Sequence, residues 1–553
     1  MATIDLYFSE LKSDLKREDL TIEQLEEILF NFGFEIDDYN KETDELKIDI
    51  TAERIDLLSY AGFLRGLKAY LGEKVNLDYK LHNSKLEVNI DPSLKDIWPY
   101  TVSAIIKNLK LDDEKLKDII RVQEKLHVTY CRKRKEGSIG IYPFEKIKFP
   151  IKFIALSPSE IKFIPLGETK LMSASEILKT HPTGIEYAHL LEAKEKYPVF
   201  IDANNAILSM PPIINSSDTG RVTTDTKEIF IECSGNDINR LKNILNILTV
   251  FFSDIGGELN TITINYPSNY NLGKIISPNL NFEKRIITID KINSLLGIVI
   301  DTDTAVNYLN RMLYIAKKKG KNEIEVLIPP FRSDVLHEVD IIDDIARAYG
   351  FSNIKLREPQ IYTISKRLPE SIHAEDIRNT LSLLGLTETM PLTLSSIEKC
   401  FNNFNLEEAN CIKLGYTKDK TLDVVVNWFT PKLFDILRNN QHKSYPQKIF
   451  VCDYVVRENK ESDIRSDTIL KTAAVISNPQ ISFNDISSVL YSFCNILGYN
   501  LELKTEDFPF LIKGRSATVI IDGRDVGFIG EFSPEVLAKN NYLMPVCGFE
   551  IEI

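Results

Sequence analysis

Apolar residues recur at helical spacing near the start of the chain, and the first such set is Ile22, Leu25, Ile28, Leu29 and Phe32. This spacing predicts an amphipathic helix with one buried face. Thr21 and Gln24 form a capping-box pattern before the face, and Gly33 follows it as a stop. A strand pattern and a second helix over about residues 59–71 come next. We therefore predict a small α+β domain over residues 1–85.

The pattern changes to the two-residue period of β-strands over residues 86–275. Strand-like runs include "SAIIKNL", "GSIGIYPF" and "KEIFIECSG". The run "PVFIDANNAILSM" has the pattern of a hairpin with Asn204 and Asn205 in its turn. An amphipathic helix, "NDINRLKNILNILTVFFSDIGG", follows the last of these strands. These features predict one mixed domain with a sheet core.

Two further domains are predicted from the remaining pattern. Residues 276–352 form a compact helical module with one strand, "EIEVLIPP". Residues 360–553 are again α+β, and "ATVIIDGRDVGFIGEF" predicts a hairpin with Asp522-Gly523 in a type I′ turn. Ser533-Pro534 then has the pattern of a helix start. The whole chain is predicted to be an α+β protein of several domains.

The stretch "PPFRSDVLHEVDIIDDIARAYGF" carries an ordered set of acidic residues. Ser333 or Asp334 is predicted to cap a helix, because a short side-chain oxygen accepts a free backbone N–H there. The predicted buried stripe consists of Val335, Val339, Ile342, Ile345, Ala346 and Tyr349. Asp340, Asp343 and Asp344 then fall on one side of this helix, and Asp334 lies at its N-terminus.

Carboxylates that lie close together repel one another unless a cation or a basic partner intervenes. Hard oxygen ligands of this kind bind magnesium. The alternative is a solvated acidic face on which Arg347 offsets part of the charge of Asp343. Residue patterns leave both interpretations open.

Two short basic clusters have a similar pair of interpretations. They are "CRKRKEG" at residues 131–137 and "AKKKGK" at residues 316–321. Either cluster can contact phosphate, or it can be a solvated loop, which the lack of interleaved aromatic residues favours. The sequence contains no P-loop, G-x-S-x-G or H-E-x-x-H motif, so motifs alone identify no catalytic pair.

Composition narrows the class of protein. The chain has 553 residues, of which 43% are hydrophobic and 27% charged, and its net charge is −13. That charge argues against a globally basic nucleic-acid wrapper. Seven cysteines are present without C-x-x-C spacing, which argues against a zinc knuckle and favours a reducing compartment. No signal-peptide pattern or membrane-length apolar run is present, so we expect a cytoplasmic protein with no membrane contact.

Several stretches together resemble one known family. They are "ITAERIDLLSYAGFLRGLKAYLG", "HPTGIEYAHLL", "ILSMPPIIN", "IPPFRSDVLHEVDIIDDIARAYGFSNI" and "KGRSATVIIDGRDVGFIGEFSPEVL". Their order and content resemble the β subunit of phenylalanyl-tRNA synthetase in its archaeal and eukaryotic cytosolic form. At least one of these stretches lies in each of the four predicted domains.

The resemblance implies a role for the acidic residues. In this family, the module corresponding to residues 276–352 is winged-helix-like and is assigned Mg²⁺ ligands at four acidic positions. Those positions correspond to Asp334, Asp340, Asp343 and Asp344. The implied role is structural or at a subunit interface.

For residues 360–553 the resemblance implies a class II synthetase core, built on an antiparallel sheet, that has lost its active site. Class II catalysis needs arginines that stabilise charge on the transferring phosphate. The hairpin "GFIGEFSPEVL" lacks the required glycine pattern and arginine. "VVREN" at residues 455–459 resembles another class II motif only superficially, and a strand-end ion pair is the expected role. ATP and phenylalanine are then expected on an α subunit, in an α2β2 heterotetramer that binds tRNA(Phe).

For residues 86–275 the resemblance implies an editing module that hydrolyses mischarged Tyr-tRNA(Phe). An apolar pocket cannot strongly reject an analogue that adds one hydroxyl, so a second hydrolytic site improves fidelity. The implied pocket residues are Ser209, Asn215, Glu232 and Ser234. Glu232 stands where the family pattern has aspartate, and Ser234 where it has threonine. The alternative is that these are polar residues at strand ends.

Three hypotheses follow for the whole chain. The first is a ligase subunit that is silent in ligation but edits and assembles with its partner. The second is a stand-alone editing hydrolase. The third is a non-catalytic, metal-stabilised scaffold or nucleic-acid-binding module. The resemblance favours the first.

Overall fold

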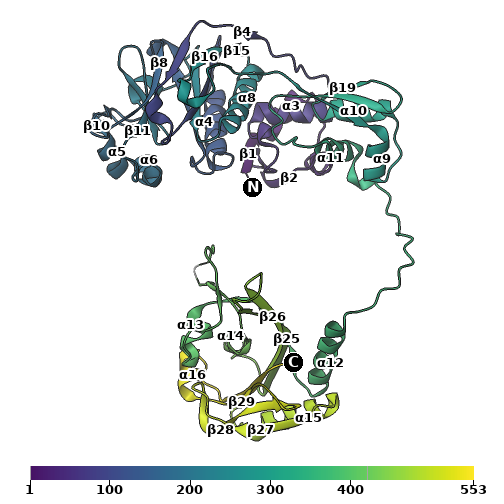
Figure 1. The fold of residues 1–553 in the computed structure, drawn as a ribbon. Coiled ribbons are helices and arrows are strands. Elements are labelled where there is room, and N and C mark those ends of the chain that lie inside the picture. The colour runs from purple at the N-terminus through teal and green to yellow at the C-terminus, as the bar shows by residue number, and fades with distance from the viewer. Residues whose placement is uncertain (1, 420) are drawn as a thin grey trace. The chain divides into compact units, whose positions relative to one another are not determined.

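The computed structural model describes residues 2–419 and 421–553 and divides into two compact units, residues 1–358 and 359–553 (Figure 1). Both units combine helices with sheets, which confirms the predicted α+β class in its coarse form. The finer division into four domains stays a prediction.

The first unit begins with a three-stranded antiparallel sheet in the order β1-β3-β2. Its elements are β1 (Ala2–Tyr7), α1 (Phe8–Asp14), α2 (Ile22–Phe32), β2 (Glu35–Asn40), β3 (Glu45–Ile50), η1 (Ile55–Leu57) and α3 (Tyr60–Tyr70). The predicted capping box of Thr21 and Gln24 is present, and Gly33 ends α2 at φ 101°. Local signals therefore set both ends of this helix.

Two larger sheets follow in the same unit. The first has the order β4 (Leu81–His82), β15 (Glu258–Asn260), β6 (Tyr100–Lys107), β14 (Ile229–Gly235) and β7 (Gly137–Pro143). The second has the order β13 (Ile214–Asn215), β12 (Ile207–Met210), β11 (Tyr197–Ile201), β8 (Ile151–Leu156), β5 (Glu87–Ile90), β16 (Ile262–Asn265) and β17 (Lys274–Ser277). A two-stranded sheet is formed by β9 (Lys162–Phe163) and β10 (Met172–Ser173).

Helices cover these sheets and complete the region. They are α4 (Asp113–Val128), α5 (Ala174–Thr180), α6 (Pro182–Tyr187), α7 (Ser217–Gly220) and α8 (Ile238–Asp254). The predicted hairpin turn lies between β11 and β12, where Asp202 Oδ1 accepts the backbone N–H groups of Asn204 and Ala206, both at 2.8 Å. Asn205 takes the left-handed conformation at φ 64°, which asparagine tolerates in turns.

The acidic stretch belongs to a region with a three-stranded sheet in the order β18-β20-β19. Its elements are β18 (Glu283–Thr288), α9 (Ile289–Leu296), α10 (Thr302–Arg311), β19 (Ile315–Lys318), β20 (Glu323–Ile328) and α11 (Glu338–Tyr349). The predicted helix cap is wrong, because α11 begins after His337, which forms a capping box with Asp340. Asp334 does not cap a helix because its carboxylate pairs with Arg332.

The later helix start also changes the buried face of α11. Ile341, Ile342, Ile345 and Ala346 are buried, as is Asp344, whereas Val339 is 43% exposed. The predicted stripe is therefore correct at Ile342, Ile345 and Ala346 but wrong at Val339. One of the four aspartates lies on the buried side.

The second unit is built on a seven-stranded sheet, in the order β21 (Thr387–Glu388), β25 (Gln447–Glu458), β26 (Ser466–Ser477), β30 (Val546–Glu552), β29 (Arg524–Phe532), β28 (Leu511–Ile521) and β27 (Leu501–Thr505). Its helices are α12 (Pro369–Leu383), α13 (Ile397–Cys400), α14 (Thr430–Asn439), α15 (Phe483–Leu497) and α16 (Pro534–Lys539). A small sheet is formed by β22 (Leu394–Ser395), β24 (Val424–Val425) and β23 (Ile412–Lys413).

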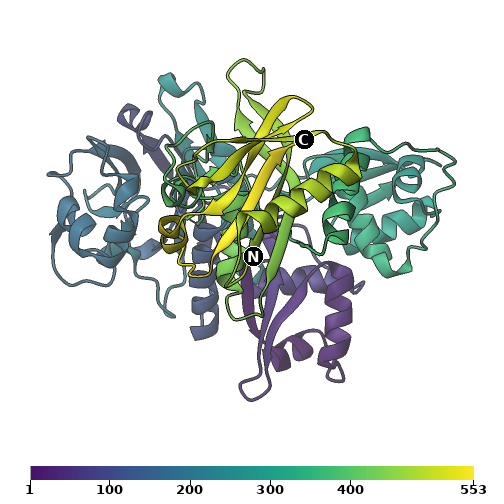
Figure 2. The ribbon, with the colours of Figure 1, turned by 90° about the horizontal axis from the view of Figure 1, so that it is seen from below.

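Both faces of the seven-stranded sheet are covered. Val451 and Val475 belong to the core under α14, whereas Phe450 and Ala474 belong to the core under α15. Figure 2 shows α15 lying over the strands. Successive residues of a strand point to opposite faces, so the nearly continuous apolar runs of β25 and β26 have the pattern of a doubly covered sheet.

Several local predictions for this unit are confirmed. Asp522 and Gly523 join β28 to β29 with φ values of 50° and 77°, as a type I′ turn requires. Ser533 caps α16. Arg457 of "VVREN" pairs with Glu552 at 2.6 Å, which is the expected strand-end ion pair.

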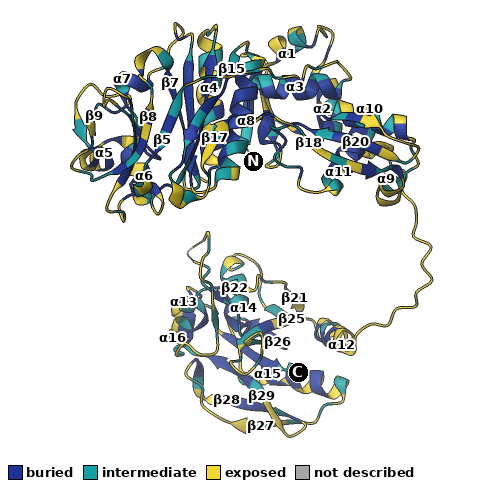
Figure 3. Ribbon diagram, turned by 45° about the horizontal axis from the view of Figure 1, so that its top comes forward, coloured by how far each residue is buried: buried dark blue, intermediate teal, exposed yellow. Residues whose placement is uncertain are grey.

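The buried residues follow the strands and the inward faces of the helices in each unit (Figure 3). Among the described residues, no helix has both the length and the apolar character that a membrane crossing requires.

Candidate functional site

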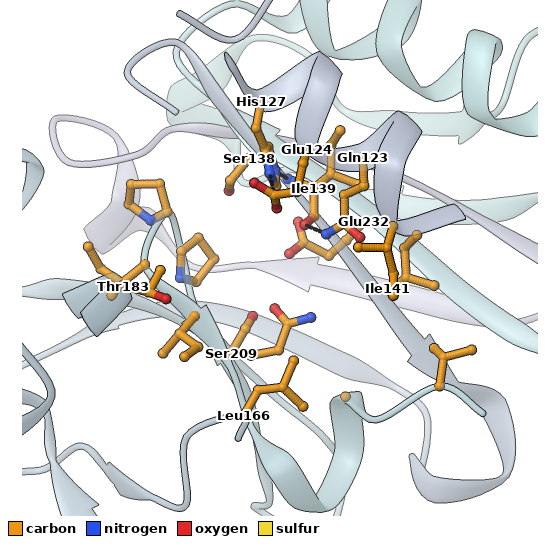
Figure 4. A pocket seen from close by; sticks show the side chains of 18 of the residues that line it. Gln123, Glu124, His127, Ser138, Ile139, Ile141, Leu166, Thr183, Ser209 and Glu232 are labelled. Atoms are coloured by element: carbon orange, nitrogen blue, oxygen red, sulfur yellow. Dashed lines mark hydrogen bonds and ion pairs between the residues drawn. The ribbon is translucent and has the colours of Figure 1, made fainter. Parts of the chain in front are cut away.

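A cavity of about 350 Å³ lies where the two large sheets of the first unit face each other. One wall comes from α4, a second from β7 and β14, and a third from β12, β13 and the loops beside them. In the view of Figure 4, His127, Glu124 and Ser138 lie on one side of the cavity, and Thr183 and Ser209 on the other. Ser209, Asn215 and Glu232 all line the cavity, so the fold brings three of the four predicted pocket residues together.

Tyr142, on β7, links these three residues. Its hydroxyl donates to Ser209 Oγ at 2.7 Å, and Glu232 Oε1 at 3.2 Å and Asn215 Oδ1 at 3.5 Å also lie within reach. Burial raises the pKa of the Tyr142 phenol well above its ordinary value, and the carboxyl of Glu232 acts in the same direction. The hydroxyl is therefore protonated near neutral pH and holds the polar groups of two different sheets in place.

Glu232 is a fully buried carboxyl group with only 1% of its surface exposed. Burial raises its pKa to about 8, and hydrogen bonds to Ser234 and Tyr142 offset only part of that shift. Oε2 has no hydrogen-bond partner among the described residues. At pH 7 the neutral carboxylic acid is therefore the favoured form, and one of its oxygens is buried without a hydrogen-bond partner among the described residues.

Ser234, the fourth predicted pocket residue, lies beside the cavity and not in its lining. It shares a face of β14 with Glu232, two residues away, and its Oγ lies 3.1 Å from Ser138 Oγ. Ser138 does line the cavity. Gly140 stands opposite Glu232 in the β7–β14 pairing, and a Cβ there would collide with the Tyr142 hydroxyl and the Glu232 carboxyl. Glycine at this position makes their close approach possible.

A second polar network lies along the wall formed by α4. His127 Nε2 accepts the backbone N–H of Ile139 at 2.9 Å, and Nδ1 lies 3.1 Å from Glu124 Oε1. Burial lowers the pKa of His127, so the ring is neutral with its proton on Nδ1. Arg134 Nη2 donates to the same Glu124 oxygen at 2.9 Å. The network fixes α4 against β7 at the edge of the cavity.

Removing the Tyr142 hydroxyl should weaken this arrangement. We expect Tyr142→Phe to lower the free energy of unfolding of residues 1–358 by about 1–2 kcal/mol, because it leaves buried polar groups without their partner. Chemical denaturation of the full chain measures the loss. Tyr416→Phe, at a side chain that is 89% exposed, is the matched control, and an equal effect of both substitutions would contradict the assigned role.

The four aspartates of the acidic stretch do not share one partner, because only Asp334 and Asp344 bind the same group. Arg332 donates from Nε and Nη2 to the two carboxylate oxygens of Asp334, at 2.9 and 2.7 Å, and from Nη2 to Asp344 at 2.6 Å. Tyr314 also donates to Asp344, at 2.6 Å. Burial opposes ionisation of Asp334, but the adjacent Arg332 holds its pKa below the ordinary value.

The other two aspartates have different partners. Asp340 accepts the backbone N–H groups of Leu336 and His337 at 2.8 and 2.6 Å, and Asp343 pairs with Arg347 at 3.0 Å. The described residues contain no group of three or more His, Cys, Asp or Glu side chains placed to hold a metal. As arranged in this chain, the four carboxylates do not fit one magnesium ion. The cation between the buried pair is a guanidinium.

Comparisons with known proteins cover nearly the whole chain. Family models match at residues 1–73 (Phe-tRNA synthetase beta subunit B1 domain), 286–351 (tRNA synthetase B5 domain) and 354–553 (Phenylalanyl tRNA synthetase beta chain CLM domain). Phenylalanine–tRNA ligase beta subunits of Thermococcus gammatolerans and Pyrococcus furiosus are 34% and 32% identical, and each alignment covers 98% of both chains.

A solved structure agrees with the first unit. An N-terminal fragment of the phenylalanyl-tRNA synthetase beta subunit from Pyrococcus horikoshii is 36% identical with a TM-score of 0.59, and the match covers 63% of this chain and 99% of that fragment. Together these matches place the chain among the subunits of aminoacyl-tRNA synthetases. Within that class, it belongs to the family of phenylalanine–tRNA ligase beta subunits.

Sequence reasoning missed several residues of the site. Tyr142, His127 and Glu124 carry no motif, and Tyr142 is 67 and 90 residues from Ser209 and Glu232. Arg134 belongs to the basic cluster at residues 131–137, for which a solvated loop was favoured over a phosphate contact. A signal for Tyr142 exists in the "GSIGIYPF" strand, where glycine and an aromatic residue alternate on one face.

Proposed function

We propose that this chain is the β subunit of a cytoplasmic phenylalanine–tRNA ligase and that it hydrolyses mischarged Tyr-tRNA(Phe) in the cavity described above. The supporting observation is the cluster of Ser209, Asn215 and Glu232 in a cavity that is also lined by apolar side chains, among them Ile119, Ile141 and Ile214. Such a site accepts an aromatic ring and offers hydrogen bonds to a phenolic hydroxyl.

Glu232 acts in this proposal as a hydrogen-bond partner of the substrate phenol. A protonated carboxyl can both donate and accept, and its Oε2 has no partner among the described residues. Because it holds its proton near pH 7, it does not serve as the general base. Phenylalanine would leave these buried polar groups unpaired, which disfavours its binding.

Ligation is assigned to an α subunit in an α2β2 heterotetramer, which binds ATP and phenylalanine and shares tRNA(Phe) with this chain. The "GFIGEFSPEVL" hairpin lacks the glycine pattern and the arginine that one class II motif requires. Large apolar side chains are exposed at Ile361, Tyr362, Ile364, Leu383, Met390 and Leu392. Exposed apolar groups of this kind support a large, obligate partner interface.

Two assays test the proposal. Phenylalanine should be attached to tRNA(Phe) only when this chain and a cognate α subunit are mixed, and neither alone should be active. The assembled complex should then hydrolyse Tyr-tRNA(Phe) faster than Phe-tRNA(Phe) in the absence of ATP. Charging by neither the mixture nor the single chains would contradict the subunit role.

A stand-alone editing hydrolase is the second candidate function, because the whole cavity lies within residues 1–358. Hydrolysis of Tyr-tRNA(Phe) by this chain without an α subunit would favour it. The assignment of Mg²⁺ to Asp334, Asp340, Asp343 and Asp344 stays a prediction for the assembled protein. Asp343 is the accessible member, with half of its side chain exposed.

A further inference from the structure

A loop of four cationic residues borders the cavity. Arg132, Lys133, Arg134 and Lys135, here called the basic loop, connect α4 to β7. Three of them take left-handed backbone conformations, with φ values of 50°, 53° and 62° in order. Consecutive non-glycine residues rarely do this, so the surrounding structure must hold the loop in its shape.

The basic loop is held in place at Cys131, the residue before it, and at Arg134. Cys131 is fully buried. Arg134 lines the cavity, donates from Nη1 to the backbone oxygen of Ile213 at 2.8 Å, and lies 4.6 Å from the ring centre of Tyr187. One cation is therefore turned inward as an anchor, and its carboxylate partner Glu124 is already engaged.

The other three cations face solvent. Arg132 is 69% exposed at its side chain and lies 3.8 Å from Glu136, and Lys133 and Lys135 are exposed. Glu136 is also 3.8 Å from Arg240, so its charge is shared. Arg221 adds another exposed cation in the cavity lining. The border of the cavity is thus locally positive on a chain whose net charge is −13.

We propose that the basic loop binds the phosphodiester backbone of the tRNA acceptor end while the aminoacyl group lies in the cavity. This inference rests on the proposed editing function. The aminoacyl ester is attached to the terminal ribose, so the preceding phosphates must lie beside the cavity. A polyanion is repelled by the chain as a whole, and fixed local cations supply the attraction that brings its end to the cavity.

The test compares a substrate with phosphates and one without. The triple variant Arg132→Gln/Lys133→Gln/Lys135→Gln, assembled with the α subunit, is assayed on Tyr-tRNA(Phe) and on 3′-O-tyrosyl-adenosine. We expect KM for Tyr-tRNA(Phe) to rise about 10-fold with kcat unchanged, since binding is lost but the cavity is not altered. The slope of log(kcat/KM) against log[salt] should flatten by about 2, the value for three contacts to a single strand. Hydrolysis of tyrosyl-adenosine should not change.

The matched control removes the same charge elsewhere. Lys317→Gln/Lys318→Gln/Lys319→Gln lies in the second basic cluster, outside the cavity lining, and should leave all three quantities unchanged. An unaltered KM and salt slope in the loop variant would overturn the inference, as would an equal loss on tyrosyl-adenosine. If the wild-type complex hydrolyses neither substrate, the editing function itself fails, and this inference fails with it.

Discussion

Replacing Arg332 by methionine is expected to lower the free energy of unfolding of residues 1–358 by about 3–5 kcal/mol, the usual cost of removing one partner from a buried ion pair. The guanidinium is 1% exposed, and Asp334 and Asp344 are 9% and 6% exposed at their side chains. Without Arg332, two carboxylates that both bonded one nitrogen would face each other in a buried site. Equilibrium denaturation of the full chain, followed by a probe in the first unit, measures this loss.

Asp343→Asn is the matched control on the same helix. Its side chain is half exposed and pairs with Arg347, so its loss should cost no more than about 0.5–1 kcal/mol. The Arg332→Met variant should also be measured with Mg²⁺ and with a chelator. Full recovery of the lost stability by Mg²⁺ would show that Asp334 and Asp344 bind a metal when the guanidinium is absent. A loss below about 1 kcal/mol would contradict the structural role of Arg332.

Local sequence signals predicted local structure well. The capping box of α2, the type I′ turn at Asp522-Gly523 and the cap of α16 each depend on residues within four positions of one another. The acidic stretch was harder because its decisive contact is not local to the helix. Asp334 was expected to cap, but Arg332 binds it and joins it to Asp344, ten residues further on. Helical spacing alone does not contain that contact.

The candidate site shows the same contrast between local sequence signals and contacts made by residues far apart in the chain. Family resemblance supplied Ser209, Asn215 and Glu232, and the fold brings them to one cavity from two sheets. Tyr142 joins them from β7, a strand that no motif marks. The shifted pKa of Glu232 depends on its complete burial, which follows from the packing of the sheets and is not encoded by any short pattern.

Substitution of Glu232 separates recognition from proton transfer. We expect Glu232→Ala to lower kcat/KM for Tyr-tRNA(Phe) hydrolysis by about 10- to 100-fold, because leaving a buried polar group without its hydrogen-bond partner costs about 1–3 kcal/mol. Glu232→Gln should keep activity within a few-fold, since a neutral amide also donates and accepts. A general base would instead lose about 10²–10⁴-fold in the glutamine variant. That outcome, measured on Tyr-tRNA(Phe) with Phe-tRNA(Phe) as the reference, would contradict the recognition role.

The same residue should make stability depend on pH in a defined direction. The pKa of Glu232 is about 8 in the folded chain and has an ordinary value of 4.5, so between these values the folded state binds one more proton than the unfolded state. The free energy of unfolding therefore decreases as pH rises through this window, and the stability that this extra proton contributes is fully present only below pH 4.5.

Asp254, whose pKa burial raises to about 6, adds a similar slope that Glu232→Gln leaves in place. The difference between wild type and Glu232→Gln isolates the Glu232 contribution, and it should shift in favour of the variant as pH rises from 5 to 8 and then level off. Parallel curves for the two proteins over this range would mean that Glu232 is ionised in the folded state at neutral pH, and its role as a neutral partner of the phenol would have to be given up.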